Sequence, residues 1–145
     1  MPFKLHPNAH IRDGLGYEDV YLVPNLSEVE SRREVDTSVS LGKGILKIPL
    51  ISANMDTVTG PEMAIALRKV GAVGALHRAC SIATAVSDYR AVCEALGDGE
   101  SLPALVTVGA GPEALERAQA LWDAGARHFV VDVAHGHSSY AFSTV

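Results

Sequence analysis

Residues 103–133 read PALVTVGAGPEALERAQALWDAGARHFVVDV, which is a strand, a helix and a second strand in immediate succession. The two strand-like runs, 103–108 and 128–133, are almost continuously apolar instead of alternating between polar and apolar residues. Strands of that kind are buried on both faces, as in a parallel sheet covered by helices. This stretch therefore predicts a parallel α/β fold.

The same unit recurs upstream, with apolar runs at 48–53 and 72–76. In the helix after the first run, Thr59 and Glu62 fit a capping box and Pro61 suits the first turn. Ser81 is placed to cap the next helix, and Gly97 to end it. The helical periodicity predicts three buried faces: Met63, Ala66, Leu67 and Val70; Ile82, Val86, Tyr89, Cys93 and Leu96; and Leu115, Ala118 and Trp122.

The spacing between strands is roughly 25–30 residues, close to that of a TIM-type (β/α)8 barrel of about 250 residues. The fold class is therefore predicted as α/β, the N-terminal half of such a barrel with about four βα units. By composition alone, a small open parallel sheet is equally allowed. We expect residues 1–47 to form an irregular or antiparallel arm, with strand-like runs at 19–23 and 35–41. Residues 48–145 would form the partial barrel, with a further helix starting after Ser138.

Composition excludes several functional classes. The net charge of −5 provides no basic field for nucleic acid or anionic lipid. The chain has two cysteines, Cys80 and Cys93, and no Cys-x-x-Cys pair, so a reducing cytoplasm is the expected location. No apolar run approaches the roughly 20 residues needed to span a membrane. We expect neither a membrane nor a nucleic-acid partner.

The segment GAGPEA, residues 109–114, matches the dinucleotide-binding pattern G-x-G-x-x-A. It follows a strand and opens a helix, and Asp132 ends the next strand, where an acidic residue would bind a ribose hydroxyl. Pro112 argues against this interpretation, because it removes an N–H group from the turn that would hold the pyrophosphate. The alternative is a tight strand-to-helix turn, and both interpretations stay open at this point.

Other polar residues suggest weaker sites. Cys80 lies three residues after His77, so a thiolate–imidazole pair is conceivable, although an idle packed thiol is favoured. His135 and His137 lack the cysteine or carboxylate support of a metal site, and a polar loop is favoured. Asp56 and Asp132 could act as acid and base, but a turn cap and a hydroxyl ligand fit them better. We predict no metal site.

Five segments together resemble the IMP dehydrogenase and GMP reductase family. They are YEDVYLVP (17–24), SRREVDTS (31–38), PLISANMDTV (49–58), GALHR (74–78) and DVAHGHS (132–138). They stand in the family's order from about residue 15 onward, and 52–58 is the most specific. The resemblance implies a β/α barrel with its active site at the carboxyl ends of the strands. It also implies hydride transfer between a nicotinamide cofactor and carbon 2 of a purine mononucleotide, with a cysteine bound covalently to that carbon.

The resemblance also implies roles for individual residues. Ala53 and Met55 would contact the nucleotide substrate. Arg78, Asp132, Val133 and Ala134 would contact the cofactor, with Asp132 binding the nicotinamide ribose. The family's nucleophilic cysteine follows the sixth strand, so we expect no catalytic residue in this chain and a truncated product that is inactive alone.

GMP reductase is favoured over IMP dehydrogenase, because Arg78 leads directly to Ser81 without the regulatory insertion that dehydrogenases usually carry. Asn54 and the segment 132–136 also look more like GMP reductase. The expected reaction is NADPH-dependent conversion of GMP to IMP and ammonia. Its alternative is NAD-dependent oxidation of IMP by a dehydrogenase without the insertion. Two further alternatives are a small NAD(P)-binding module and an inert fragment.

The resemblance also implies a homotetrameric assembly for the full-length protein. Half a barrel would have two unpaired edges. If the chain folds alone, it should therefore self-associate or be marginally stable.

Overall fold

A computed structural model describes residues 14–145 of the chain, which divides into two compact units with the boundary between Val35 and Asp36. The described part of the first unit contains two 3-10 turns, Tyr17–Asp19 and Arg32–Glu34. Val20 has extended dihedral angles, φ −130° and ψ 145°, yet residues 19–23 pair with no strand in the described part of the chain. The strand predicted there is wrong, because no neighbouring backbone completes it.

The second unit begins with an antiparallel hairpin of β1 (Val39–Leu41) and β2 (Gly44–Leu46). Gly42 occupies the first loop position with φ 59°, a left-handed value that suits glycine in a two-residue hairpin turn. The hairpin confirms the antiparallel expectation for this segment. The division into an arm of 1–47 and a partial barrel of 48–145 stays a prediction.

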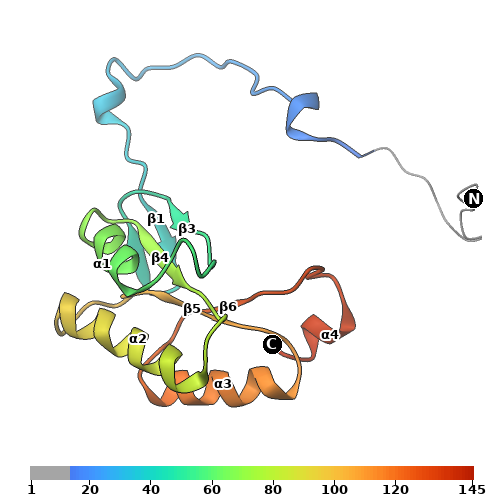
Figure 1. The fold of residues 1–145 in the computed structure, drawn as a ribbon. Coiled ribbons are helices and arrows are strands. Elements are labelled where there is room, and N and C mark those ends of the chain that lie inside the picture. Colours follow the sequence, from blue (N-terminus) through green and yellow to red (C-terminus); the bar gives the residue numbers. More distant parts are fainter. Residues whose placement is uncertain (1–13) are drawn as a thin grey trace, which may run out of the picture. The chain divides into compact units, whose positions relative to one another are not determined.

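The main sheet has four parallel strands in the order β3-β4-β5-β6, as Figure 1 shows. They are β3 (Ile51–Ser52), β4 (Val73–Leu76), β5 (Leu105–Val108) and β6 (Phe129–Val131). The helices that follow them in turn are α1 (Pro61–Lys69), α2 (Ile82–Leu96), α3 (Pro112–Asp123) and α4 (Ser139–Phe142). The parallel α/β prediction is confirmed. Because the strand order never reverses, this sheet lacks the switch point of a doubly wound dinucleotide-binding domain.

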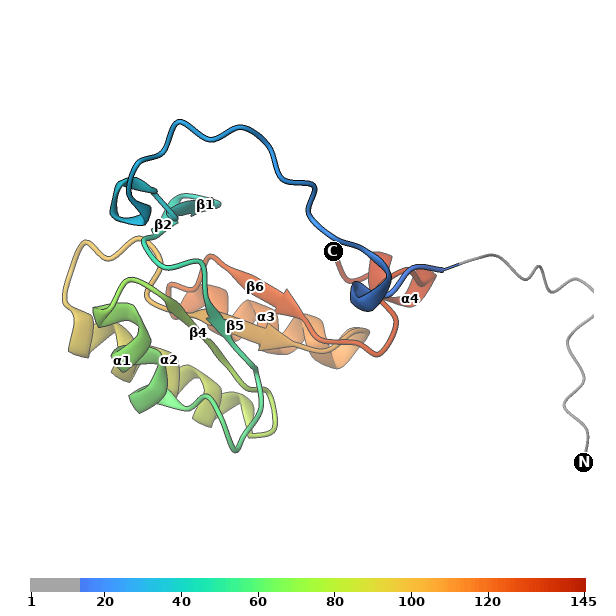
Figure 2. The ribbon, with the colours of Figure 1, turned by 90° about the horizontal axis from the view of Figure 1, so that it is seen from above.

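The helices α1, α2 and α3 lie along one face of this sheet (Figures 1 and 2). Side chains alternate between faces along a strand. On the helix-covered face, Leu76, Val106 and Val108 join the core that contains Val92 and Leu121 of the helices. On the other face a smaller core forms, in which Leu46 of the hairpin and Leu102 pack with Val73, Ala75 and Leu105.

Helix α1 turns a different face to the sheet from the predicted one. Met63, Ala66 and Val70 are exposed, whereas Ala64 is fully buried. A Cβ atom added to Gly74 of β4 would lie 2.7 Å from the Ala64 Cα, so helix and strand touch through their smallest residues. The close approach selects alanine at this position, while the predicted Leu67 and its neighbour Ile65 are only partly buried.

Helix α3 shows the same correction. Ala114 and Leu121 are buried, while Leu115 and Trp122 are half exposed. The Trp122 ring lies against the Arg127 guanidinium instead, with 4.0 Å from the ring centroid to Cζ. Helix α2 matches its prediction in part. Tyr89 is buried, and the Ser81 hydroxyl accepts a hydrogen bond from the Thr84 N–H at 3.1 Å. The other four predicted residues of this face are only partly buried, and Ala85 and Val92 are buried in their place.

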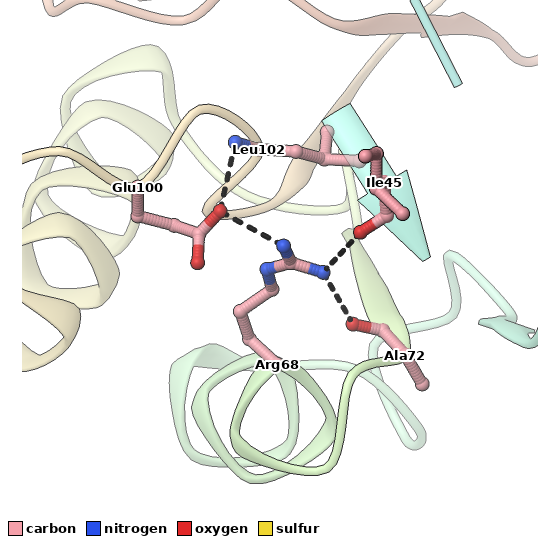
Figure 3. A network of polar contacts seen from close by, with 5 residues as sticks. All are labelled: Ile45, Arg68, Ala72, Glu100 and Leu102. Carbon is pink, nitrogen blue, oxygen red and sulfur yellow. Dashed lines mark hydrogen bonds and ion pairs between the residues drawn. The ribbon is translucent and has the colours of Figure 1, made fainter. Parts of the chain in front are cut away.

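A polar network fixes the amino-terminal ends of the two central strands (Figure 3). Nη1 of Arg68 donates to the carbonyls of Ile45 and Ala72 at 3.2 and 3.4 Å. Nη2 of Arg68 binds Glu100 Oε1 at 2.9 Å, and that oxygen also accepts from the Leu102 N–H at 3.1 Å. Burial raises the pKa of Glu100, but the bonds from Arg68 and Leu102 outweigh it and hold that pKa below its usual value. The network joins the hairpin to the chain entering β4 and β5.

No helix among residues 14–145 has both the length and the apolar character that a membrane span requires.

Candidate functional site

The carboxyl ends of β4, β5 and β6 meet at one edge of the sheet, where they form a pocket of about 610 Å³. Its walls come from the loops after these strands, the first turns of α2 and α3, and the segment around α4. The lining residues are Arg78, Ile82, Gly109, Ala110, Glu113, Ala114, Arg117, Asp132, Val133, Ala134, His135, Ser138 and Tyr140. All four predicted cofactor residues are in this set.

An ion pair crosses this pocket. Nε of Arg78, after β4, lies 3.0 Å from Oδ2 of Asp132, after β6. Between them runs Gly109, where an added Cβ would be 3.5 Å from Nη1 of Arg78. Both side chains are nearly half exposed, and the described residues offer the Asp132 carboxylate no second partner. One carboxylate oxygen and the guanidinium Nη groups are therefore available to a ligand.

A second arginine supports the pocket from helix α3. Nη2 of Arg117 donates to the carbonyl of Cys80, and Nη1 lies 4.0 Å from the Cys80 sulfur. The Cys80 thiol donates to the carbonyl oxygen of His77 at 3.9 Å, and among the described residues no bond joins it to the imidazole. The arrangement fits the idle, packed thiol and gives no support to a thiolate–imidazole pair.

The predicted substrate residues lie elsewhere on the rim. Ala53 and Met55 belong to the loop between β3 and α1, both are exposed, and neither lines the pocket. The loop ends at Thr59, whose hydroxyl bonds Ser52 and the Ala53 carbonyl. Gly60 is the N-cap of α1 and makes no side-chain cap bond, so the predicted capping box of Thr59 and Glu62 is wrong. The Thr59 hydroxyl binds Ser52 and the Ala53 carbonyl, so it does not cap the helix as the local sequence predicts.

The turn at Gly109 does not present a set of free backbone N–H groups that could bind a phosphate. The Gly111 N–H donates to Thr144 Oγ1 at 3.2 Å, and the Tyr140 hydroxyl donates to the Ala110 carbonyl at 2.7 Å. Pro112 supplies no N–H group at all. Together with the strand order, these contacts favour the ordinary strand-to-helix turn over the dinucleotide-binding motif.

The remaining polar candidates do not assemble into a site. The His135 and His137 rings pack edge to face with centroids 6.4 Å apart, and His137 also packs on Phe142 at 5.6 Å. Within residues 14–145, no three His, Cys, Asp or Glu side chains gather as metal ligands would. Asp56 is exposed on the Met55 loop, outside the pocket that holds Asp132.

The sequence analysis assigned no individual role to several residues that line the pocket, among them Glu113, Arg117 and Tyr140. Glu113 and Arg117 stand one helical turn apart at the start of α3, so a search for charged i, i+4 pairs opposite a strand end could have found them. No local pattern in the sequence predicts Tyr140 as a pocket residue. It lines the pocket because α4 packs beside the Gly109 turn, where the Tyr140 hydroxyl binds the Ala110 carbonyl.

The pocket lies at the carboxyl edge of a parallel sheet, and successive loops contribute charged residues to it. This arrangement is typical of α/β enzymes, which bind their ligands at that edge. The comparisons with known proteins then identify the family. The model of the IMP dehydrogenase / GMP reductase domain matches residues 14–145, and the chain belongs to that family of oxidoreductases.

Individual relatives carry both names. The chain is 36% identical to a GMP reductase of Levilactobacillus brevis over 136 residues, covering 92% of this chain and 38% of the relative. It is 34% identical to an inosine-5'-monophosphate dehydrogenase of Cryptosporidium parvum over 166 residues, covering 89% of this chain and 41% of the relative.

The crystal structure of inosine 5' monophosphate dehydrogenase from Legionella pneumophila superposes with a TM-score of 0.73 at 43% identity. That match covers 88% of this chain and 38% of the Legionella chain. The chain thus spans about two fifths of the length of these three relatives.

Proposed function

We propose that this chain carries the cofactor-contacting part, and one substrate loop, of a purine-nucleotide oxidoreductase, and that the enzyme is a GMP reductase. The four parallel strands would be the first half of a closed β/α barrel, with the substrate and cofactor sites on one rim. The reaction would consume GMP, NADPH and protons and release IMP, NADP⁺ and ammonia.

The direct connection from β4 to α2 carries the preference for GMP reductase. β4 ends at Leu76 and α2 starts at Ile82, with Ser81 already serving as its N-cap. The alignment to the Cryptosporidium dehydrogenase spans 166 residues, more than the 145 of this chain, so it includes positions that this chain lacks. The alignment to the Levilactobacillus reductase, 136 residues over 92% of the chain, needs almost no such positions. The alternative is an IMP dehydrogenase without the regulatory insertion.

The pocket residues suit a nicotinamide cofactor. Asp132, with one carboxylate oxygen held by Arg78, would accept hydrogen bonds from the nicotinamide ribose through the other. Arg78 would offer its Nη groups to a phosphate. Val133 and Ala134 line the same wall and would contact the ring. When bound, the cofactor supplies the hydride; the residues of this chain bind and orient it.

Met55 and Ala53 would contact the purine nucleotide from the β3 loop. No residue of this chain is assigned as nucleophile, since Cys93 of α2 packs against the core between helices and sheet and the Cys80 sulfur lies against the His77 carbonyl. A cytoplasmic location and a homotetrameric assembly belong to the same proposal.

The test is an assay of the complete gene product that contains these residues, following NADPH oxidation with GMP beside NAD reduction with IMP. GMP-dependent NADPH oxidation with release of ammonia supports the reductase. IMP-dependent NAD reduction would transfer the assignment to the dehydrogenase, and absence of both activities from a folded gene product would refute the proposal.

Asp132→Asn tests the cofactor site in that protein. Loss of charge-assisted hydrogen bonds to the ribose should raise the KM for NADPH roughly tenfold to a hundredfold. Asp98→Asn, the same change in the loop after α2 at the other end of the sheet, should leave that KM unchanged. Equal effects of the two substitutions would show that Asp132 has no special contact with the cofactor.

A further inference from the structure

The loop between β3 and α1 has almost no packing of its own. Five of its residues, Ala53, Met55, Asp56, Thr57 and Val58, are exposed, and Asn54 is only partly buried. A loop of this kind takes its conformation from its ends. Thr59, at the end of the loop, differs from these residues because it is fully buried, with 0% of its surface exposed.

Three bonds converge on that end of the loop. The Thr59 hydroxyl donates a hydrogen bond to the Ala53 carbonyl at 2.6 Å. A second hydrogen bond, 2.7 Å between the oxygens, joins the hydroxyl groups of Thr59 and Ser52. The Thr59 N–H donates to the Met55 carbonyl at 2.9 Å. One residue thus ties the last residue of β3, the first residue of the loop and Met55 together.

The Thr59 methyl group also has a defined contact. A Cβ atom added to Gly74 of β4 would be 3.2 Å from the Thr59 Cγ2, so this methyl group packs directly on the neighbouring strand. Threonine is then required on two counts: the methyl fills the space above Gly74, and the hydroxyl closes the loop. Valine keeps the first property and loses the second, whereas serine does the reverse.

We propose that Thr59 is a positioning residue, which sets the conformation of the 53–58 loop and so places Met55 against a purine mononucleotide. The inference rests on the proposed function for the identity of the ligand. The anchoring of the loop by Thr59 is independent of it. Removing the hydroxyl leaves the Ala53 carbonyl without its partner and unties the start of the loop from its end. The N–H groups of Val58 and Thr59 keep their bonds to the Met55 carbonyl at 3.0 and 2.9 Å, so the loop changes conformation without coming apart.

The methionines provide a local probe, because the 145-residue chain has only three, Met1, Met55 and Met63. Methionine labelled with ¹³C in the methyl group therefore gives one signal from the loop and one from α1. In Thr59→Val, the Met55 signal should shift or broaden while the Met63 signal stays in place. Thr59→Ser should restore the Met55 signal of the original chain.

Thr107→Val is the matched control. Thr107 is 2% exposed on β5, and its hydroxyl oxygen has no hydrogen-bond partner among the described residues. The same chemical change at this position removes no anchor and should leave the Met55 signal unaltered. If Thr59→Val does not fold, Ser52→Ala removes the other hydroxyl of the pair and should perturb Met55 in the same direction.

Titration with GMP separates this inference from the proposed function. We expect GMP to move the Met55 signal of the original chain, and the apparent Kd to rise about tenfold in Thr59→Val and not in Thr107→Val. No response of the original chain to GMP or IMP would count against the proposed nucleotide site alone. A Met55 signal in folded Thr59→Val identical to that of the original chain would overturn the positioning role.

Discussion

The two central strands and the two outer strands of the sheet differ sharply in burial. β4 and β5 are buried at every position. β3 is exposed at Ile51, and β6 is only partly buried throughout. In the described residues, each central strand has a neighbour on both sides, and each outer strand has one.

The difference shows what this chain completes by itself. The central strands have helices on one face and the hairpin core on the other, so their apolar residues are already out of water. The outer strands have the same apolar character but present an unpaired edge, which favours association with another strand. This is the pattern expected if further strands continue the sheet on both sides.

The largest effect should come from shortening a central side chain. Leu105→Ala on β5, where the leucine is 6% exposed, should lower the free energy of unfolding by about 2–5 kcal/mol. Ile51→Ala on β3 removes the same number of carbon atoms from a residue that is 50% exposed and should cost about 1 kcal/mol or less. Urea unfolding of both variants measures the difference.

Equal losses at the two positions would break the comparison, because they would mean that Ile51 is buried in solution by a partner. Repeating the measurement over a range of protein concentrations distinguishes that case, since burial between copies makes stability rise with concentration.

A smaller effect is expected at the amino-terminal ends of the central strands. Glu100→Gln should lower the free energy of unfolding by about 1–2 kcal/mol near neutral pH, because the ion pair with Arg68 is lost. The folded state holds the pKa of Glu100 below the usual value of 4.5. Its contribution is therefore complete above pH 4.5 and disappears as the pH falls through the lowered pKa.

Unfolding curves of the original chain and of Glu100→Gln should accordingly converge as the solution is acidified below pH 4.5. Glu94→Gln, on the exposed side of α2, is the control and should run parallel to the original chain. A gap between the first two curves that persists in acid would show that Glu100 stabilises through packing instead of charge.

The sheet and helix α2 could be predicted because their signals are local. Continuous apolar runs mark the strands, and Ser81 and Gly97 bound a helix whose periodicity is clear. The buried faces of α1 and α3 could not be read this way. On α1 the periodicity favours Met63, whereas the close contact with Gly74 requires Ala64 at the interface. On α3 it favours Trp122, whose ring instead packs on the Arg127 guanidinium.

The candidate site was predictable in part for a similar reason. Arg78 and Asp132 follow strands, and parallel strands deliver such residues to one edge. Thr59 has a local motif that predicts a helix cap, yet Ser52 and Ala53 lie within reach of its hydroxyl only after the chain folds. Arg117 reaches the pocket from a helix, and Tyr140 from a segment beyond the last strand.

The smallest effect is expected where the carboxyl ends of a central and an outer strand are joined. Arg78 follows β4 and Asp132 follows β6, and both side chains are nearly half exposed at 47% and 43%. A double-mutant cycle of Arg78→Gln and Asp132→Asn should give a coupling free energy of about 0.5 kcal/mol, reduced further by salt. Urea unfolding of the four proteins at low and high salt measures it. A coupling of about 1–2 kcal/mol or more would contradict this expectation, because the exposed pair would then stabilise the fold as much as the Arg68–Glu100 pair does. A weak coupling is what a ligand site requires, because an ion pair that contributes little to folding can be rearranged by a bound cofactor at little cost in stability.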